Sequence, residues 1–520
     1  MAQLMKLDGI FSDGMIFQRE VTNELWGTDA AAQSVTAQID GVSFSASVEN
    51  GRFRLTMPAH DAAEGLTLTV SGSEEIVLND ICFGDVLLLT GQSNMELPVG
   101  RVLDASPDTV NDSYPLIRQF SIRPLPEVGR PAESIPENKW IRAQGGELLM
   151  FSAAGYFCAR RIFLERGVPV GLILAAQGGS VIESWMPEEA LARFGDYSEE
   201  LKRFSGEGVL GGIIARRDRE IAGWTAVQDT GVSKEYSAAV PEGAGRINVP
   251  FMLRDTELKG FCGSVWFYKD VFLDEQPQGE CMLRAGVLID SDTAYVNGTQ
   301  IGQTGYRYPP RKYRFDAGLL HKGHNLVAIR LIVSGRDGGF IAAHPYRLET
   351  GSGCIDLTGE WLYKIEHTAD DVMPVVQMAQ SVPTWLYNGS IVPLAGLRFA
   401  GSLWYQGESN AEDWERYDEK FALMLECWRS VLKQPLPVIC VEMCDYVEPT
   451  DADGSRAALT GDVHNTPGWD RIQEFQKHAP ETAELCECVS AKDLGELLEL
   501  HPQRKEELGE RLAKKVLEFF

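Results

Sequence analysis

The sequence lacks the two kinds of segment that carry a protein to or across a membrane. It contains no run of about 18 apolar residues, which excludes a membrane-spanning helix. Its first residues also lack a basic start followed by an apolar stretch of about 7–15 residues, the pattern of a secretory signal. We therefore expect no membrane partner and a cytoplasmic location.

Positive charge is scarce in this chain. The 48 Lys and Arg residues face 75 Asp and Glu residues, so the formal net charge is −27 at pH 7. A negative field of this kind repels the phosphates of nucleic acids and anionic membrane surfaces. Nucleic acid is therefore not an expected partner.

A zinc-site pattern of cysteines is also missing, because the pairs Cys440–Cys444 and Cys486–Cys488 are matched neither by a second pair at zinc-site spacing nor by a nearby histidine cluster. The ten cysteines are scattered, and several lie in apolar runs, among them Cys82, Cys158 and Cys440. This pattern is typical of reduced, buried thiols. We expect neither a metal ion nor another cofactor.

A chain of 520 residues is too long for one core, so several domains are expected. The patterns of apolar and polar residues divide the chain into four stretches. Residues 1–85 show short runs of alternating polar and apolar residues, separated by turn formers such as Asp40-Gly41, and predict an N-terminal β-sandwich. Residues 226–370 have the same pattern and predict a second β-sandwich. Residues 86–225 and 371–520 predict one α/β domain that the second sandwich interrupts.

The α/β domain is predicted from continuous apolar runs alternating with helical patterns. Such runs are typical of strands buried on both faces of a parallel sheet, and they begin at Val86, Val170, Ser402 and Val438. Helical patterns cover residues 153–165, 414–431 and 504–520. The predicted fold class is α/β, a three-layer α/β/α sandwich with a parallel sheet, accompanied by the two β domains.

Polar segments follow the first two of these strands. Ser93 stands in Gly91-Gln92-Ser93-Asn94, where a tight strand-to-helix turn can expose a nucleophilic hydroxyl beside its own N–H. The alternative is a serine that caps a helix. Gly178 and Gly179 follow the second strand and can bring backbone N–H groups to an oxyanion, although an ordinary turn has the same composition.

The third strand ends in Trp404-Tyr-Gln-Gly-Glu-Ser-Asn410. Aromatic, amide and carboxylate side chains in one turn are typical of sugar sites. Because ligands bind beyond the carboxyl ends of parallel strands, we expect all three segments to meet at one site.

His501, in Leu500-His501-Pro502, is the candidate general base. It precedes the last predicted helix, and the acidic residues Asp493, Glu496 and Glu499 lie upstream. A histidine there can reach a nucleophile while a carboxylate fixes its tautomer. A surface histidine beside a helix is the alternative.

Together these segments resemble the sialate O-acetylesterase and carbohydrate acetylesterase branch of the SGNH hydrolases. The resemblance covers nearly the whole chain and rests on five strings: FSDGMIFQR from Phe11, GQSNME from Gly91, GGS with ESWM from Gly178, LWYQGESN from Leu403 and LHP with LGERL from Leu500. It implies a serine esterase that removes O-acetyl groups from sugars, with an SGNH-type sandwich as its catalytic domain.

The resemblance also implies a role for each residue of the site. Ser93 would be the nucleophile and His501 the general base. The oxyanion would be held by the Ser93 N–H, a Gly178 or Gly179 N–H and the Asn410 side chain. The substrate-binding candidates are Gln92, Trp404, Gln406 and Glu408.

The chain departs from the family at the triad acid. The position three residues before the histidine, where SGNH enzymes usually carry an aspartate, is Leu498. We favour Glu499 over Asp493 as its replacement, and a Ser–His dyad is the third possibility.

The second sandwich resembles a galactose-binding-like jelly roll, with Asn297-Gly298 in its hairpin. Whether it binds sugar or only frames the cleft stays open, as does the oligomeric state. The substrate is expected to be an O-acetylated sialic acid or an acetylated xylo-oligosaccharide. The alternative is a sugar-binding protein on a catalytically weak hydrolase core. A lipase is disfavoured, because residues 445–475 predict a loop rich in Asp, Gly and Asn rather than an apolar lid.

Overall fold

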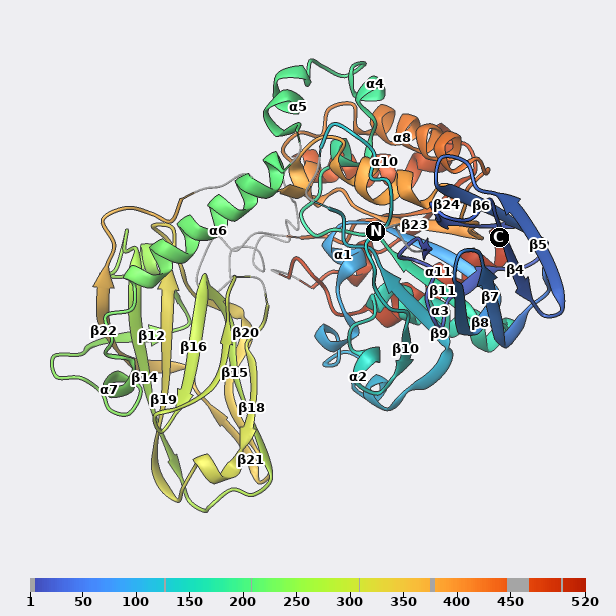
Figure 1. Ribbon diagram of the computed structural model, residues 1–520. Coiled ribbons are helices and arrows are strands. Elements are labelled where there is room, and N and C mark those ends of the chain that lie inside the picture. Colours follow the sequence, from blue (N-terminus) through green and yellow to red (C-terminus); the bar gives the residue numbers. More distant parts are fainter. Residues whose placement is uncertain are drawn as a thin grey trace.

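The computed structural model describes residues 5–125, 128–206, 208–307, 309–374, 379–446, 467–496 and 499–520. Helices and strands are mixed along the chain, which confirms the predicted α/β class. Figure 1 shows two bodies of different character, a larger one that contains both chain ends and a smaller all-β one to its side. Among the described residues, no helix has the length and apolar composition needed to cross a membrane.

The N-terminal stretch forms two small layers of strands. One layer has the order β1 (Lys6–Leu7), β3 (Asn23–Thr28), β6 (Arg52–Met57), and the other joins β2 (Ile16–Gln18), β4 (Ser34–Ile39), β5 (Val42–Ser47), β7 (Ala63–Ser71) and the start of β8 (Glu75–Gly91). Every second residue of β4 and of β6 is buried. This is the burial that the alternating sequence predicts for strands with one face on a core.

Strand β8 runs without a break from this region into the parallel sheet. Up to Gly84 it pairs with β2 and β7, whereas from Asp85 it pairs with β11 (Val170–Leu174) and from Leu87 with β23 (Gly401–Tyr405). The predicted division between residues 85 and 86 therefore lies inside one strand, where the partners change. As a result, the N-terminal layers are tied rigidly to the strand that leads to Ser93.

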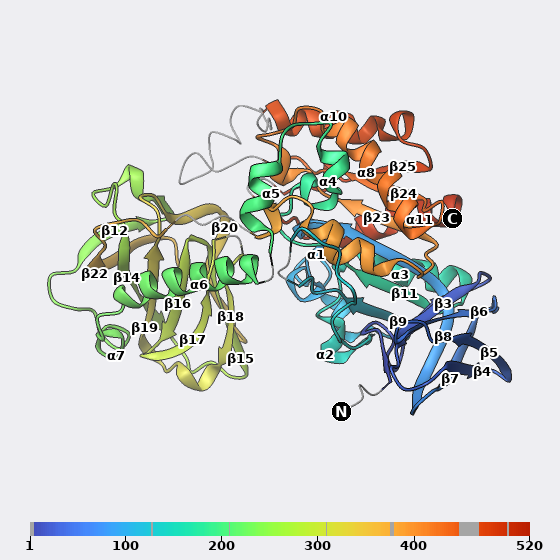
Figure 2. The ribbon, with the colours of Figure 1, turned by 45° about the horizontal axis from the view of Figure 1, so that its top comes forward.

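The central sheet has the order β10 (Ile141–Gln144), β9 (Ser113–Ser121), β11, β8, β23, β24 (Val438–Glu442), β25 (Cys486–Ser490), and only β10 is antiparallel. All residues of β11, β23 and β24 are buried, as continuous apolar runs predict. Helices α3 (Ala153–Arg166) and α11 (Lys505–Phe519) pack together, and so do α8 (Tyr417–Leu432) and α10 (Pro467–Thr482). Figures 1 and 2 place these two helix pairs on opposite faces of the sheet.

The loop predicted over residues 445–475 is wrong at its C-terminal end, because α10 begins at Pro467. Proline fits the first turn of a helix, where its missing N–H has no partner to lose. Trp469, Ile472 and Gln476 follow at helical spacing and are buried against the sheet. Residues 447–466 of the predicted loop lie outside the described residues.

The all-β body contains two facing sheets with their own core. The first has the order β12 (Gly245–Val249), β22 (Gly359–Thr368), β14 (Gly263–Leu273), β19 (Gly323–Val333), β16 (Ser291–Val296), β17 (Thr299–Thr304). The second has the order β13 (Phe251–Met252), β20 (Gly339–Thr350), β15 (Glu280–Ile289), β18 (Lys312–Asp316), with β21 (Gly353–Asp356) on β20. Helix α6 (Val209–Val227) leads into this body, which we call the inserted β body (Figure 1).

The remaining α-helices of the described residues are short. They are α1 (Ser93–Glu96), α2 (Gly145–Leu148), α4 (Glu188–Leu191), α5 (Ser198–Phe204) and α7 (Ser233–Tyr236).

Candidate active site

The polar segments meet because β11, β8 and β23 are neighbouring parallel strands whose carboxyl ends lie at one edge of the sheet. Ser93 begins α1 directly after β8. Gly91, at φ +107°, allows this sharp turn, since a Cβ there would lie 2.2 Å from the Tyr405 carbonyl oxygen. The Gln92 N–H donates to that same oxygen at 2.8 Å, which ties the first segment to the third.

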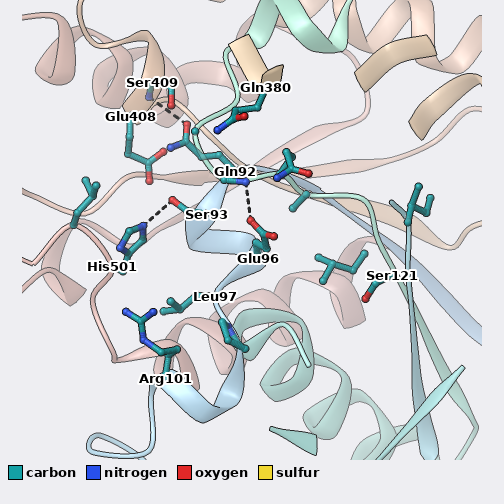
Figure 3. A pocket seen from close by; sticks show the side chains of 18 of the residues that line it. Gln92, Ser93, Glu96, Leu97, Arg101, Ser121, Gln380, Glu408, Ser409 and His501 are labelled. Atoms are coloured by element: carbon teal, nitrogen blue, oxygen red, sulfur yellow. Dashed lines mark hydrogen bonds between the residues drawn. The ribbon is translucent and has the colours of Figure 1, made fainter. Parts of the chain in front are cut away.

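A cavity of about 1190 Å³ opens at this edge. All four motif segments contribute to its wall, together with Tyr306 of the inserted β body. The volume exceeds the roughly 300–1,000 Å³ of ordinary small-molecule sites, so the cavity has room for more than an acetyl group. Figure 3 shows Ser93, Glu96, Glu408 and His501 around its floor.

Ser93 and His501 form the central contact of the cavity. The Ser93 Oγ lies 2.8 Å from the His501 Nε2. Burial lowers the pKa of His501 and, together with the weaker effect of the positive charges of Lys505 and Arg101, brings it to about 3. A neutral imidazole at this distance can accept the hydroxyl proton at neutral pH.

The structure separates the two predicted acid candidates. Glu499 is 2% exposed, and its Oε1 accepts a hydrogen bond from the His501 backbone N–H at 2.9 Å. Burial raises the pKa of Glu499 to about 7. Asp493 instead places both carboxylate oxygens on Arg511, each at 2.7 Å. Of the two, only Glu499 lies beside His501, and Leu498 lies outside the described residues.

The two glycines after β11 differ in what their N–H groups do. The Gly178 N–H donates to the Glu96 carboxylate at 2.7 Å. Gly179 adopts φ +75°, a left-handed conformation that favours glycine. A Cβ on Gly178 would lie 3.4 Å from the Ser93 Cβ, so this turn closes directly against the nucleophile.

Asn410 does not reach the cavity, which corrects its predicted oxyanion role. It is 1% exposed, and its Oδ1 accepts from the Ile182 N–H at 2.9 Å and from the Gln406 amide at 2.7 Å. Its own NH₂ group donates to Glu183 at 3.1 Å. These partners hold the Asn410 side chain behind the turn, away from Ser93.

Trp404 and Gln406 are also wrongly predicted to bind substrate. Both are fully buried. Trp404 packs edge to face against Trp185 and Trp428. Gln406 donates to the Ser180 carbonyl oxygen at 3.0 Å and to Asn410. They fix the wall of the site from behind, because their hydrogen bonds and ring contacts are made inside the protein.

Gln92 and Glu408 do line the cavity, as predicted for substrate-binding residues. The Glu408 Oε1 accepts a hydrogen bond from the Asn94 amide at 2.6 Å. Burial raises the pKa of Glu408. The Gln92 Oε1 accepts from the N–H groups of Gly407 and Ser409 at 3.4 and 3.2 Å.

Five residues near Ser93 and His501 were not predicted from the sequence. Glu96 stands in the GQSNME string and is the only one with a local signal. Arg101 and Tyr306 line the cavity. The His344 Nε2 lies 3.7 Å from the Glu499 Oε2, and Lys505 is buried beneath the site with its pKa lowered to about 8 by burial. Among the described residues, no group of three or more acidic, histidine or cysteine side chains could hold a metal ion.

Part of this chain is similar to known carbohydrate esterases. Residues 387–518 match the family model of carbohydrate esterase, sialic acid-specific acetylesterase. Human sialate O-acetylesterase is 27% identical over 125 residues, 23% of this chain and 24% of that protein, and the mouse protein is 29% identical over 126 residues, 23% of each. The chain thus spans about a quarter of the length of the curated relatives it matches.

A solved structure resembles nearly the whole chain. The crystal structure of a carbohydrate acetylesterase from Xanthomonas citri aligns with a TM-score of 0.57 and 18% sequence identity, over 99% of this chain and 75% of that chain. At this identity the likeness concerns the fold alone. The family model and the curated relatives bear out the resemblance to sialate O-acetylesterases over about a quarter of the chain, and the Xanthomonas citri structure bears out the fold.

Proposed function

We propose that this chain belongs to the sialate O-acetylesterase and carbohydrate acetylesterase family, which its C-terminal quarter resembles, and that it hydrolyses O-acetyl esters of carbohydrates with Ser93 as nucleophile and His501 as general base. The observation that carries the proposal is the 2.8 Å contact between Ser93 Oγ and His501 Nε2 at the floor of the cavity. A serine and a neutral histidine in this arrangement are what acyl transfer requires.

The first half of the reaction transfers the acetyl group to the enzyme. As the Ser93 Oγ attacks the carbonyl carbon, His501 takes the hydroxyl proton and the carbonyl π electrons move to the oxygen. Collapse of this tetrahedral intermediate breaks the bond to the sugar oxygen. His501 then returns the proton to that oxygen, which leaves as a sugar hydroxyl.

The second half regenerates the enzyme. Water enters the site, His501 removes its proton, and the hydroxide attacks the acetyl carbon. The bond to the Ser93 Oγ breaks, the oxygen recovers the proton from His501, and acetate leaves. We assign the stabilisation of the imidazolium in both halves to Glu499, which is held beside His501 by the 2.9 Å bond to its N–H. A dyad without Glu499 is the remaining alternative.

We also propose an identity for each part of the fold. We assign the parallel sheet and its two helix layers to the SGNH hydrolase sandwich, with residues 86–225 and 371–520 as its two parts. Residues 1–85 would be an N-terminal sandwich, and residues 226–370 an inserted galactose-binding-like jelly roll. The change of strand partners at Asp85 and the separate core of the inserted β body support this division.

The test of the proposed chemistry is Ser93→Ala. We expect release of acetate from p-nitrophenyl acetate to fall by about 10³-fold or more, because the nucleophile is lost. Ser45→Ala, on an exposed position of β5, is the matched control and should keep wild-type activity. A Ser93→Ala protein that is folded by circular dichroism and retains full activity would falsify the assignment.

A panel of acetylated sugars tests which of them is the substrate. Acetate release should be measured from 9-O-acetyl sialic acid, acetylated xylo-oligosaccharides and acetylated glucose, since the proposal covers the first two. With a cytoplasmic location, the substrate would be a small imported sugar. Binding of these sugars by calorimetry without any acetate release would instead support a sugar-binding protein on an inactive core.

A further inference from the structure

The oxyanion of the tetrahedral intermediate needs hydrogen-bond donors aimed at one point beside Ser93. Two of them are backbone groups. In the turn after β11, the N–H groups of Gln177, Gly178 and Ser180 donate to Gly91, Glu96 and Gln177. The Gly179 N–H has no acceptor among the described residues, and neither has the Ser93 N–H. These two are therefore available to the oxyanion.

A side-chain donor must come from a residue other than Asn410. Its NH₂ group faces Glu183, and Asn410 is not part of the cavity wall. A replacement must line the cavity, carry an N–H donor and have that donor uncommitted. Gln92 meets all three conditions.

Gln92 is held in one orientation by the third segment. It is 3% exposed, and its Oε1 accepts from two backbone N–H groups, those of Gly407 and Ser409. Because an amide oxygen accepts and an amide NH₂ only donates, this pair of bonds fixes which end of the amide faces the loop. Among the described residues, the hydrogen bonds of this side chain are these two, and both go to the oxygen.

The NH₂ end of Gln92 consequently faces the cavity. Figure 3 shows the Gln92 side chain bonded to Ser409 through its oxygen, with its other end turned to the side where the Ser93 hydroxyl lies. Gln92 also directly precedes Ser93 in the chain, so the same turn that presents the nucleophile presents this amide.

We propose that the Gln92 side-chain amide is a catalytic oxyanion donor, which acts with the N–H groups of Ser93 and Gly179. The proposal rests on the esterase function proposed above and names the group that replaces Asn410 in it. A donor that meets the oxyanion in the transition state raises kcat, whereas one that only binds the sugar lowers KM.

The sharpest variant is Gln92→Glu. It keeps the shape of the side chain and an oxygen for Gly407 and Ser409, but it replaces the donor with an acceptor. We expect kcat for p-nitrophenyl acetate to fall by about 10²–10³-fold, the usual cost of one oxyanion donor, with KM within about threefold of wild type. Gln92→Met, which removes donor and acceptor, should lose a similar factor.

The comparison variant is Asn410→Ser. If Asn410 were the donor, this variant would show the large loss of kcat and Gln92→Glu would not, which would overturn the proposal. Activity per folded site is obtained by titrating Ser93 with a fluorophosphonate, so that partial unfolding is not counted as lost catalysis. If Gln92→Met does not fold, Gln92→Asn, whose shorter side chain withdraws the NH₂ group, gives the same test.

Three further outcomes also decide between these roles. A rise in KM for acetylated sugars with unchanged kcat would make Gln92 a binding residue and overturn its oxyanion role. If Gln92→Glu keeps kcat while Ser93→Ala abolishes it, the esterase function stands and only the Gln92 proposal fails. If Ser93→Ala keeps its activity, the proposed function itself fails.

Discussion

At the scale of single residues, the Glu96 carboxylate holds the N–H of one of the two glycines that follow β11. It accepts from the Gly178 N–H at 2.7 Å and lies in the cavity wall beside Ser93 (Figure 3). Burial raises the pKa of Glu96. With Gly178 held in this way, the neighbouring Gly179 N–H is left for the oxyanion, so Glu96 is a positioning residue.

Glu96→Leu and Glu96→Gln should therefore behave differently. A hydrogen bond to a charged acceptor contributes about 1.5–3 kcal/mol, so its loss in Glu96→Leu should lower kcat by roughly 10-fold or more through the displaced turn. Glu96→Gln keeps an acceptor oxygen for Gly178 and should recover most of that loss. Steady-state kinetics with p-nitrophenyl acetate provide the measurement, and equal losses in both variants would show that the charge matters instead.

The site residues differ in how far the sequence could predict them. Ser93 and His501 were predicted because a nucleophile and its base stand in short strings at the ends of a strand and a helix. The composition of the string from Trp404 to Asn410 does not reveal which of its side chains face the cavity. Glu408 does, whereas Trp404 and Asn410 are turned into the protein by partners far away in the chain.

At the scale of elements, the first turn of α11 supports the loop that carries His501. Lys505, the first residue of this helix, is 2% exposed and donates to the Asn94 Oδ1 at 2.7 Å. The Asn94 NH₂ group donates to the Leu500 carbonyl oxygen at 3.0 Å. A buried cation thus orients the amide that holds the residue before His501.

Lys505→Met should change the pH profile of the enzyme as well as its rate. The Lys505 charge is one of the groups that lower the pKa of His501, after burial. Its removal raises that pKa, and since His501 must be neutral to act as base, the acid limb of kcat/KM should move to higher pH.

The control for this variant is Lys514→Met, on the exposed side of α11. It should leave both the rate and the acid limb unchanged. The charges of Glu499 and Arg101 also lie near His501. The pH profile is therefore measured at constant ionic strength, so that the screening of these charges does not change. A Lys505→Met enzyme with lower kcat but an unshifted acid limb would show a structural role alone.

The elements themselves were largely predictable, whereas their buried charges were not. Apolar residues at helical spacing predicted a helix over 504–520, and α11 covers Lys505–Phe519. Such spacing says which face is buried, and lysine is rarely on it. Lys505 is buried because Asn94, more than 400 residues away in the sequence, offers it an acceptor, and no local pattern contains that contact.

At the scale of the whole molecule, the inserted β body contributes Tyr306 to the wall of the cavity. Tyr306, half exposed, lines the cavity and accepts a hydrogen bond from Arg101 at 3.2 Å. Asp104, close to Arg101 in the chain, pairs with Arg284 at 2.8 Å and with Lys312. The alternating sequence predicted this β region, but not which of its residues would meet the catalytic side, because those contacts join distant parts of the chain.

Asp104→Asn tests whether the ion pairs that join Asp104 to the inserted β body affect the binding of sugar substrates. Burial alone would raise the pKa of Asp104, but the hydrogen bonds from Arg284 and Lys312 outweigh it and keep that pKa below its usual value. Removing the charge weakens both ion pairs and loosens the wall that carries Tyr306. We expect KM for acetylated oligosaccharides to rise by about threefold to 10-fold, since an exposed aromatic contributes roughly 1 kcal/mol to a contact, while kcat for p-nitrophenyl acetate stays near wild type.

The dependence of KM on salt concentration gives an independent measure of the same ion pairs. Ion pairs at a partly exposed interface weaken as ionic strength rises, so wild-type KM for the oligosaccharide should increase with NaCl, and the Asp104→Asn enzyme should respond less. Asp108→Asn, on an exposed residue nearby, should follow the wild type. Equal salt responses in the wild type and in Asp104→Asn would contradict a role for these ion pairs in holding the cavity wall, and would leave the inserted β body as a scaffold whose contact with sugar does not depend on Asp104.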